Sequence, residues 1–180
     1  WTSYKERICY RTCSRKNSNI GSSSRDGDWL YFRKFSTAIM KILVLQGPNI
    51  NLLGLKSSTL KHQLTLGKLN KVIRSEFKEE RIELKFLQTH KNFQAINFLQ
   101  RNRNKAIGLL FIPTSWARNN YTILETIKLI NINTSAVYFS DQYSLGTNEK
   151  ESIFLGKNIK PFTGDPISSC LAGMKHILSK

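Results

Sequence analysis

The side chains best placed for chemistry in this 180-residue sequence lie just after short apolar runs. The string GPNIN at 47–51 ends one run, and its Gly-Pro turn sets Asn49 where a side-chain amide can hydrogen bond into a pocket mouth. Three cations, Lys56, Lys61 and Arg118, lie in segments that follow such runs. Cations in these places form either a solvated basic rim or an anion-binding cleft. The chemistry to look for is therefore anion binding beside an amide donor.

The elements that must position these residues alternate in hydrophobic period. Strand-type runs are expected at 41–46, 81–88, 106–112, 135–140 and, weakly, 158–162; helical spacing is expected at 64–80, 93–104, 121–131 and 165–180. Asp165 followed by Pro166 is a strong helix-start signal. This order predicts a doubly wound α/β domain with a five-stranded parallel sheet. Ligands of such sheets bind beyond the carboxyl ends of the strands, so 47–60, 88–92, 112–120 and 140–150 are the segments of interest.

The net charge and the number of cysteines limit the kinds of partner, metal and compartment to expect. Lys and Arg number 28 against 12 Asp and Glu, a net charge of +16, which favours polyanions or anionic ligands but also arises from genome bias. No apolar run reaches the roughly 18 residues of a membrane-spanning helix, so no membrane partner is expected. Cys9 and Cys13 lack a second pair, so neither zinc nor another metal is expected, and Cys170 has the pattern of a buried thiol. Three cysteines fit a reducing compartment, either the cytoplasm or an organelle matrix.

Residues 1–39 form a second compositional zone. They are basic, rich in Ser, Arg and Gly in their centre, and show no persistent period. Such a segment cannot bury enough apolar surface to offset its ordering entropy, so we expect an N-terminal extension that is largely disordered, with a short ordered piece near 29–32. Three interpretations stay open: an organelle transit segment, an RNA-binding arm, or a stretch outside the native product, because Met40 stands just before the first strand.

The string MKILVLQGPNINLLG resembles the type II 3-dehydroquinate dehydratases, and the resemblance extends over 40–180. FLQTH after the second strand, LLFIP in the third and GDPISSCLAGMKHIL at the end fall where that family has its corresponding elements. The resemblance implies a flavodoxin-like fold of three layers, a small anionic substrate, no cofactor and a homo-oligomer, commonly a dodecamer. In that family the first Asn of the string, here Asn49, helps to hold a water against an enolate intermediate.

The resemblance also implies a reaction, the anti elimination of water from 3-dehydroquinate. A tyrosine activated by an arginine takes a proton, and a histidine oriented by a glutamate protonates the departing hydroxyl. In the lid pattern K-R-x-P-x-x-Y-G, Lys56 stands in the arginine slot and Lys61 in the tyrosine slot. Setting the fourth-strand pattern E-V-H-L-S-N against 137–142 puts Phe139 in the histidine slot and Val137 in the glutamate slot.

The remaining slots concern substrate contacts. After the third strand the family pattern N-P-G-A-Y-T-H-T-S places Arg118 where a substrate-binding histidine is expected, and Ser140 and Asp141 after the fourth strand are further contacts by resemblance. Loss of one general acid or base costs roughly 10²–10⁴-fold in rate. Phe139 cannot move a proton, and Lys61 would serve as base only with a depressed pKa. We therefore expect a weak or inactive dehydratase.

Two further classes of function compete with that expectation. The charge and the basic arm favour a pseudoenzyme of this fold that serves as a structural or RNA-associated component of a ribonucleoprotein such as an organellar ribosome. A flavodoxin-like anion binder ranks last, because the sequence lacks a Gly-rich phosphate loop.

Overall fold

A computed structural model describes residues 39–58 and 63–179 of the chain. Three predictions therefore concern residues outside these ranges: the disorder of the N-terminal extension, the short ordered piece within it, and the placement of Lys61.

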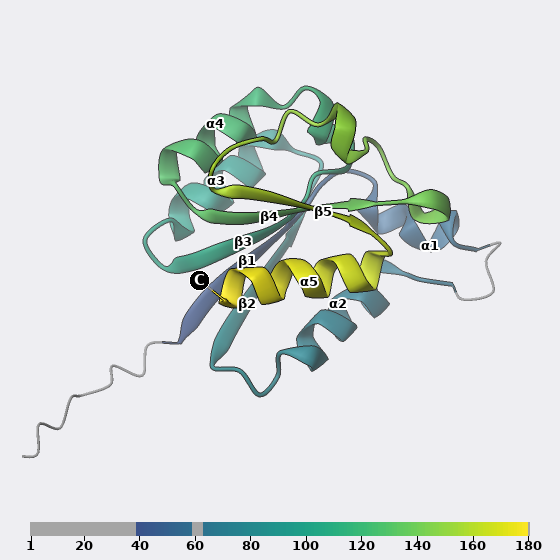
Figure 1. Cartoon of the computed structure of the whole chain (residues 1–180), viewed down its shortest axis with the longest axis horizontal. Coiled ribbons are helices and arrows are strands. Elements are labelled where there is room, and N and C mark those ends of the chain that lie inside the picture. Colours follow the sequence, from purple (N-terminus) through teal and green to yellow (C-terminus); the bar gives the residue numbers. More distant parts are fainter. Residues whose placement is uncertain (1–38, 59–62, 180) are drawn as a thin grey trace, which may run out of the picture. The chain divides into compact units, whose positions relative to one another are not determined.

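A five-stranded sheet forms the middle layer (Figure 1), with strand order β2-β1-β3-β4-β5 and every neighbouring pair parallel. The strands are β1 (Met40–Gln46), β2 (Ile82–Gln88), β3 (Ala106–Ile112), β4 (Asn133–Phe139) and β5 (Ile159–Gly164). This is the flavodoxin-like order, in which the chain reverses its direction of travel between β1 and β3. The predicted doubly wound fold is confirmed.

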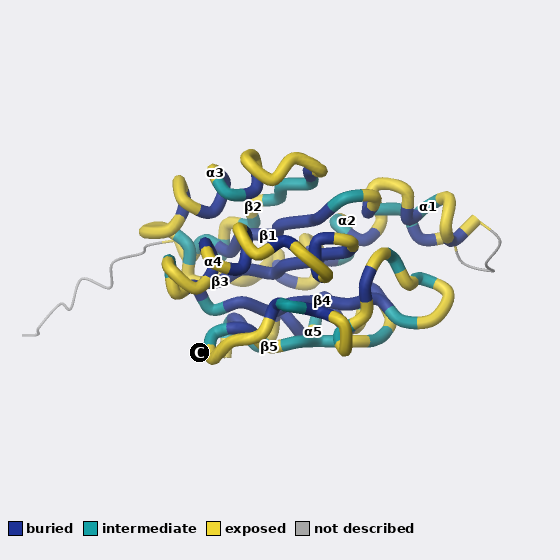
Figure 2. The backbone as a smooth tube through the Cα atoms, turned by 90° about the horizontal axis from the view of Figure 1, so that it is seen from above, coloured by how far each residue is buried: buried dark blue, intermediate teal, exposed yellow. Residues whose placement is uncertain are grey.

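Helices cover both faces of the sheet, α3 and α4 on one and α2 and α5 on the other (Figure 1). They are α1 (Leu53–Lys56), α2 (Leu66–Glu76), α3 (Asn92–Asn102), α4 (Tyr121–Ile130) and α5 (Pro166–Leu178), with 3-10 turns η1 (Ile50–Leu52), η2 (Thr114–Arg118), η3 (Asp141–Tyr143) and η4 (Glu149–Glu151). Two apolar clusters result, one under α3 and α4 and one under α2 and α5. The central strands β1, β3 and β4 form long buried stretches between the two clusters (Figure 2), whereas most residues of the edge strands β2 and β5 are half-buried or exposed. Among the described residues no helix is long and apolar enough to cross a membrane.

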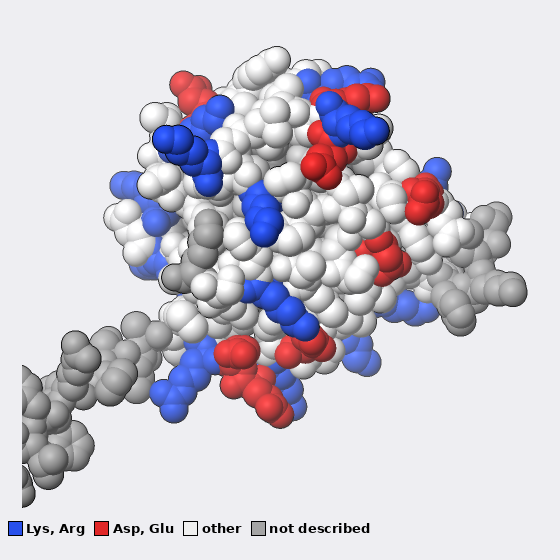
Figure 3. Space-filling view, in the orientation of Figure 1, with Lys and Arg blue, Asp and Glu red and all other residues white. Residues whose placement is uncertain are grey.

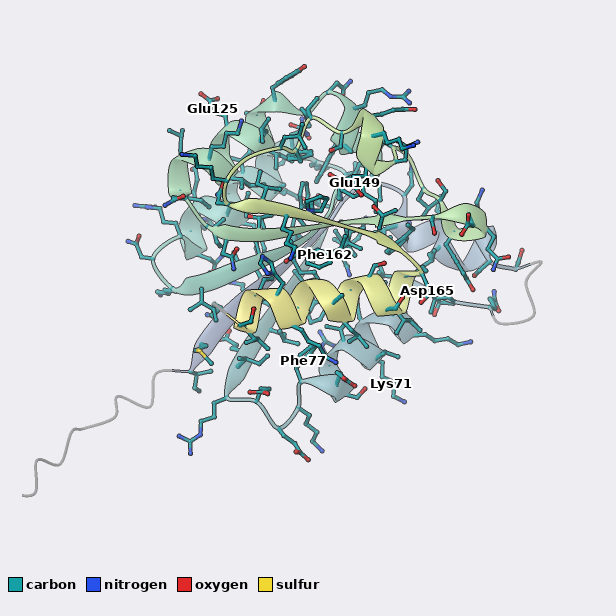
Figure 4. The ribbon with its side chains drawn as sticks, in the orientation of Figure 1. Lys71, Phe77, Glu125, Glu149, Phe162 and Asp165 are labelled. Carbon is teal, nitrogen blue, oxygen red and sulfur yellow. The ribbon has the colours of Figure 1, made fainter. Side chains whose placement is uncertain are left out.

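Local sequence signals explain where the helices begin. Asp165 precedes α5 (Figure 4), and its Oδ2 accepts hydrogen bonds from the backbone N–H of Ile167 at 3.1 Å and of Ser168 at 3.2 Å. The predicted cap and the proline in the first turn are thus confirmed. Helix α2 is shorter than the predicted 64–80, because Thr65 caps it and its apolar period ends at Phe77.

Candidate functional site

Three adjacent strands end in strained backbone at the same edge of the sheet. Asn49 after β1, Thr114 after β3 and Asp141 after β4 have φ angles of 64°, 50° and 50°. Asn and Asp enter this left-handed region with little penalty, whereas a β-branched Thr there is a genuine outlier. Such strain costs about 1–3 kcal/mol per residue and clusters at functional sites. The carboxyl edge that the sequence predicted is therefore the candidate site, and Thr114 is a residue that sequence reasoning missed.

Contacts between the loops after β1 and β3 hold Thr114 in this conformation. Its hydroxyl lies 2.7 Å from the carbonyl oxygen of Pro48 and 2.7 Å from that of Pro113. The backbone N–H of Gly47 donates to the carbonyl of Ile112 at 2.8 Å. A Cβ on Gly47 would lie 2.4 Å from the Pro113 carbonyl oxygen, so only glycine fits where the two loops meet. The Gly-Pro turn of the opening string thus serves a close approach of two strand ends.

The segment after β4 packs over the turn after β3. Gly146 has a φ of 78°, and a Cβ on it would lie 2.3 Å from the backbone nitrogen of Ser115. Farther along, the N–H of Ile153 donates to the carbonyl of Ala117 at 2.8 Å. Backbone therefore covers this part of the strand ends. Two surface cavities, one beside α3 and one on α4, are lined by residues outside the strand-end loops.

Two of the three predicted cations, Lys56 and Arg118, lie in the described structure. Lys56 is exposed in the last turn of α1, and Lys61 lies outside the described residues. The guanidinium of Arg118 is 2.5 Å from the carboxylate of Glu151, so its charge is already compensated. Glu151 belongs to the segment before β5, and it brings a carboxylate beside Arg118 at the strand ends.

The slots assigned to the acid and its partner lie in the apolar interior. Phe139 is 6% exposed and Val137 1% exposed, and both belong to the cluster under α2 and α5. Ser140 follows at the end of β4, and its hydroxyl donates to the exposed Asp141 carboxylate at 3.1 Å. Asn49 is exposed in the turn after β1. Neither Phe139 nor Val137 can exchange a proton with a ligand.

Tyr138 is a second residue that the sequence reasoning passed over. The family pattern E-V-H-L-S-N can also be aligned one residue earlier, so that its Ser-Asn falls on Ser140-Asp141. This alignment places Tyr138 in the histidine slot and Ala136 in the glutamate slot. The Tyr138 hydroxyl lies 2.7 Å from that of Ser152. Burial raises the pKa of Tyr138, an effect that the Ser152 hydrogen bond opposes. In both registers the histidine and the glutamate are absent.

Two other predictions concern cysteine and metal. Cys170 is fully buried on α5, as predicted, and burial raises the pKa of its thiol. In the described ranges, no three side chains of His, Cys, Asp or Glu come together as metal ligands.

Comparison with known proteins places this geometry in a family. The profile of the family "Dehydroquinase class II" matches residues 40–178. The 3-dehydroquinate dehydratase of Clostridium acetobutylicum is 32% identical over 144 residues, which cover 78% of this chain and all of that protein. The enzyme of the same name from Endomicrobium trichonymphae is 28% identical over 139 residues, covering 77% of this chain and 97% of that one.

Solved structures agree on the fold. The type II dehydroquinase of Butyrivibrio crossotus superimposes with a TM-score of 0.63 at 20% identity, covering 77% of this chain and 97% of that one. A 3-dehydroquinate dehydratase-like protein from Bifidobacterium longum gives a TM-score of 0.52 at 16% identity, with coverages of 78% and 99%. At these identities the likeness concerns the fold alone. The extent of the profile match and the identity to the Clostridium protein show that this chain belongs to the class II dehydroquinase family.

Proposed function

We propose that this chain is a non-catalytic member of the family, which keeps the fold and has lost turnover of 3-dehydroquinate. The observation that carries the proposal is the burial of Phe139 and Val137 in an apolar cluster, at 6% and 1% exposure. An elimination requires one group to take a proton and another to give one. With Tyr138 taken as the acid slot instead, its hydroxyl is engaged by Ser152 and its pKa lies above that of a free tyrosine. That pKa is far from the neutral range that suits a general acid.

The electrostatics of the strand ends support the same proposal. The ion pair between Arg118 and Glu151 removes one of the cations that would attract a carboxylate substrate. Asn49 remains exposed, but an amide that holds a water cannot itself transfer the two protons that the elimination requires. A small anionic substrate and a homo-oligomer remain proposals that follow from family membership.

The direct test is a turnover assay on the purified full chain with 3-dehydroquinate, followed through the absorbance of the enone product. The Clostridium acetobutylicum relative is the positive control. We expect a rate at background. A kcat within tenfold of about 10 s⁻¹, the median for enzymes, would overturn the proposal. In that case Lys61 would have to be the base, and Lys61→Ala should abolish the rate.

An RNA-associated structural role is the second candidate, favoured by the net charge of +16. Figure 3 shows Lys and Arg scattered among Asp and Glu on one face of the molecule, with no single-sign patch there. Binding of the full chain to single-stranded RNA should therefore be weak and should fall steeply between 50 and 200 mM salt. Fluorescence anisotropy with a labelled oligonucleotide measures this, and affinity that is independent of salt would argue against it. A reducing compartment, cytoplasmic or organellar, is proposed as the location, because three cysteines do not make a disulfide framework.

A further inference from the structure

A surface cavity beside the edge strand has no part in the chemistry discussed so far. It has a volume of about 340 Å³ and lies between β2 and α3. Its lining residues come from the outer strand of the sheet and from one face of the helix: Lys85, Leu87, Gln94, Asn97, Phe98, Arg101 and Asn102. Because α3 runs back along the sheet from the end of β2, the cavity follows the side of the sheet and not its carboxyl edge.

A buried amide organises the inner wall of this cavity. Asn102 is only 5% exposed, and its Nδ2 donates to the carbonyl of Phe98 at 2.6 Å. That bond orients its Oδ1, which accepts a hydrogen bond from the ammonium of Lys85 at 3.3 Å. The same ammonium lies 5.8 Å from the centre of the Phe98 ring. Lys85 is therefore held against the cavity wall by two contacts, so less of its rotamer freedom remains to be lost on binding.

The cavity carries positive charge without a matching acid. Neither Lys85 nor Arg101 forms an ion pair with a described residue. Glu83, two residues before Lys85 on β2, lies 3.0 Å from the ammonium of Lys41 instead. Two cations that flank a partly apolar pocket attract an anion, and a doubly charged head group satisfies both.

The other residues that line the cavity indicate what the uncharged part of the ligand would be. The half-buried Leu87 and the edge of Phe98, which is 9% exposed, offer an apolar surface, and the exposed amides of Asn97 and Gln94 can hydrogen bond to polar edges. Gln94 already accepts from the hydroxyl of Thr89 through its Oε1, which leaves its NH₂ for a ligand. The volume lies near the lower end of the roughly 300–1,000 Å³ of small-molecule sites.

We propose that this cavity is a binding site for a small organophosphate, with the phosphate between Lys85 and Arg101 and a flat, partly apolar body against Leu87 and Phe98. A nucleoside monophosphate has this chemistry, whether free or as one unit of a single-stranded RNA. The site is independent of any dehydratase activity, so its test and that of the proposed function can fail separately.

The test uses AMP, adenosine, inorganic phosphate and a uridine oligonucleotide as probes in calorimetric titrations of the full chain. The test variants are Lys85→Gln and Arg101→Gln. The matched control is Arg103→Gln, which removes the same charge from the same end of α3 but lies outside the cavity lining, where Arg103 donates to the carbonyl of Gln100 at 2.9 Å. Circular dichroism establishes that each variant is folded, and Lys85→Arg, which keeps the charge, should keep most of the affinity.

We expect AMP to bind at least tenfold more tightly than adenosine or inorganic phosphate. Each of the two cavity variants should weaken AMP at least tenfold, and Arg103→Gln should weaken it less than twofold. An equal loss in all three variants would overturn the proposal, because it would indicate diffuse attraction to a basic surface. Equal affinity for phosphate and AMP would also overturn it, because Leu87 and Phe98 would then contribute nothing to binding. Tight binding of the oligonucleotide without binding of AMP would replace it with an RNA surface.

Discussion

The guanidinium of Arg118 lies 2.5 Å from the carboxylate of Glu151 and thereby joins the turn after β3 to the turn before β5. Both side chains are more than half exposed, at 66% and 51%. An exposed pair of this kind contributes roughly 0–1 kcal/mol. Its main effect is therefore on charge at the strand ends.

Substituting Glu151→Gln should lower the free energy of unfolding by no more than about 1 kcal/mol at low salt. Urea denaturation of the variant and the unmodified chain measures the difference, which should vanish near 1 M salt because the pair is screened. A loss well above that range, or one that salt leaves unchanged, would mean that Glu151 has a structural role beyond the ion pair.

Restoring the family's residues at the assigned slots should fail. The triple variant Phe139→His, Val137→Glu and Lys61→Tyr places a carboxyl where Val137 is 1% exposed among apolar side chains. An uncompensated buried charge costs about 3–5 kcal/mol, so we expect a strongly destabilised protein without turnover. Thermal unfolding and the enone assay on the same sample decide the matter. Measurable turnover in a stable triple variant would show that these slots do reach a substrate.

Gly47→Ala should destabilise the protein by about 1–3 kcal/mol through overpacking, since its Cβ would lie 2.4 Å from the Pro113 carbonyl oxygen. The control is Gly67→Ala in α2, whose Cβ meets nothing nearer than 3.9 Å. That change should be neutral or stabilising by up to about 1 kcal/mol. Chemical denaturation compares the two, and equal effects would contradict the account of the loop contact.

Tyr138 should make stability fall in alkali. Burial raises its pKa above the ordinary 10.0, so the folded state keeps the proton at a pH where the unfolded state has lost it. The contribution is therefore intact below about pH 10 and is lost as pH rises through the folded pKa. Tyr138→Phe should remove this part of the decline and cost about 1 kcal/mol at neutral pH through the lost Ser152 bond. Tyr121→Phe, on an exposed tyrosine, is the control and should follow the unmodified curve.

Cys170 should resist thiol reagents in the folded protein. It is fully buried, and burial raises the pKa of the thiol, so little thiolate is present to react. Reaction with a disulfide reagent at pH 8, with peptide mapping to separate Cys170 from Cys9 and Cys13, gives the rate. Modification of Cys170 should appear only after denaturant is added, and rapid labelling under native conditions would show that α5 opens locally.

The sequence by itself determined the fold, because its signals are local. Strands and helices follow from alternating apolar periods, and Asp165-Pro166 marks a helix start through backbone hydrogen bonds to neighbouring residues. The GPNINLLG string added the family, which the comparisons confirm. The carboxyl edge of the strands also followed from topology alone, since parallel strands of one sheet end together.

Only the tertiary structure decided how the candidate site is arranged, because contacts over long sequence separations are not written in any local period. Thr114 is forced into a left-handed conformation by a loop 66 residues away, and Arg118 meets a carboxylate 33 residues further along. The side to which Phe139 points depends on which helix covers β4, and that is a matter of packing between distant elements. The cavity between Lys85 and Arg101 likewise exists only because α3 folds back along the edge strand, which brings together two cations that the sequence keeps apart.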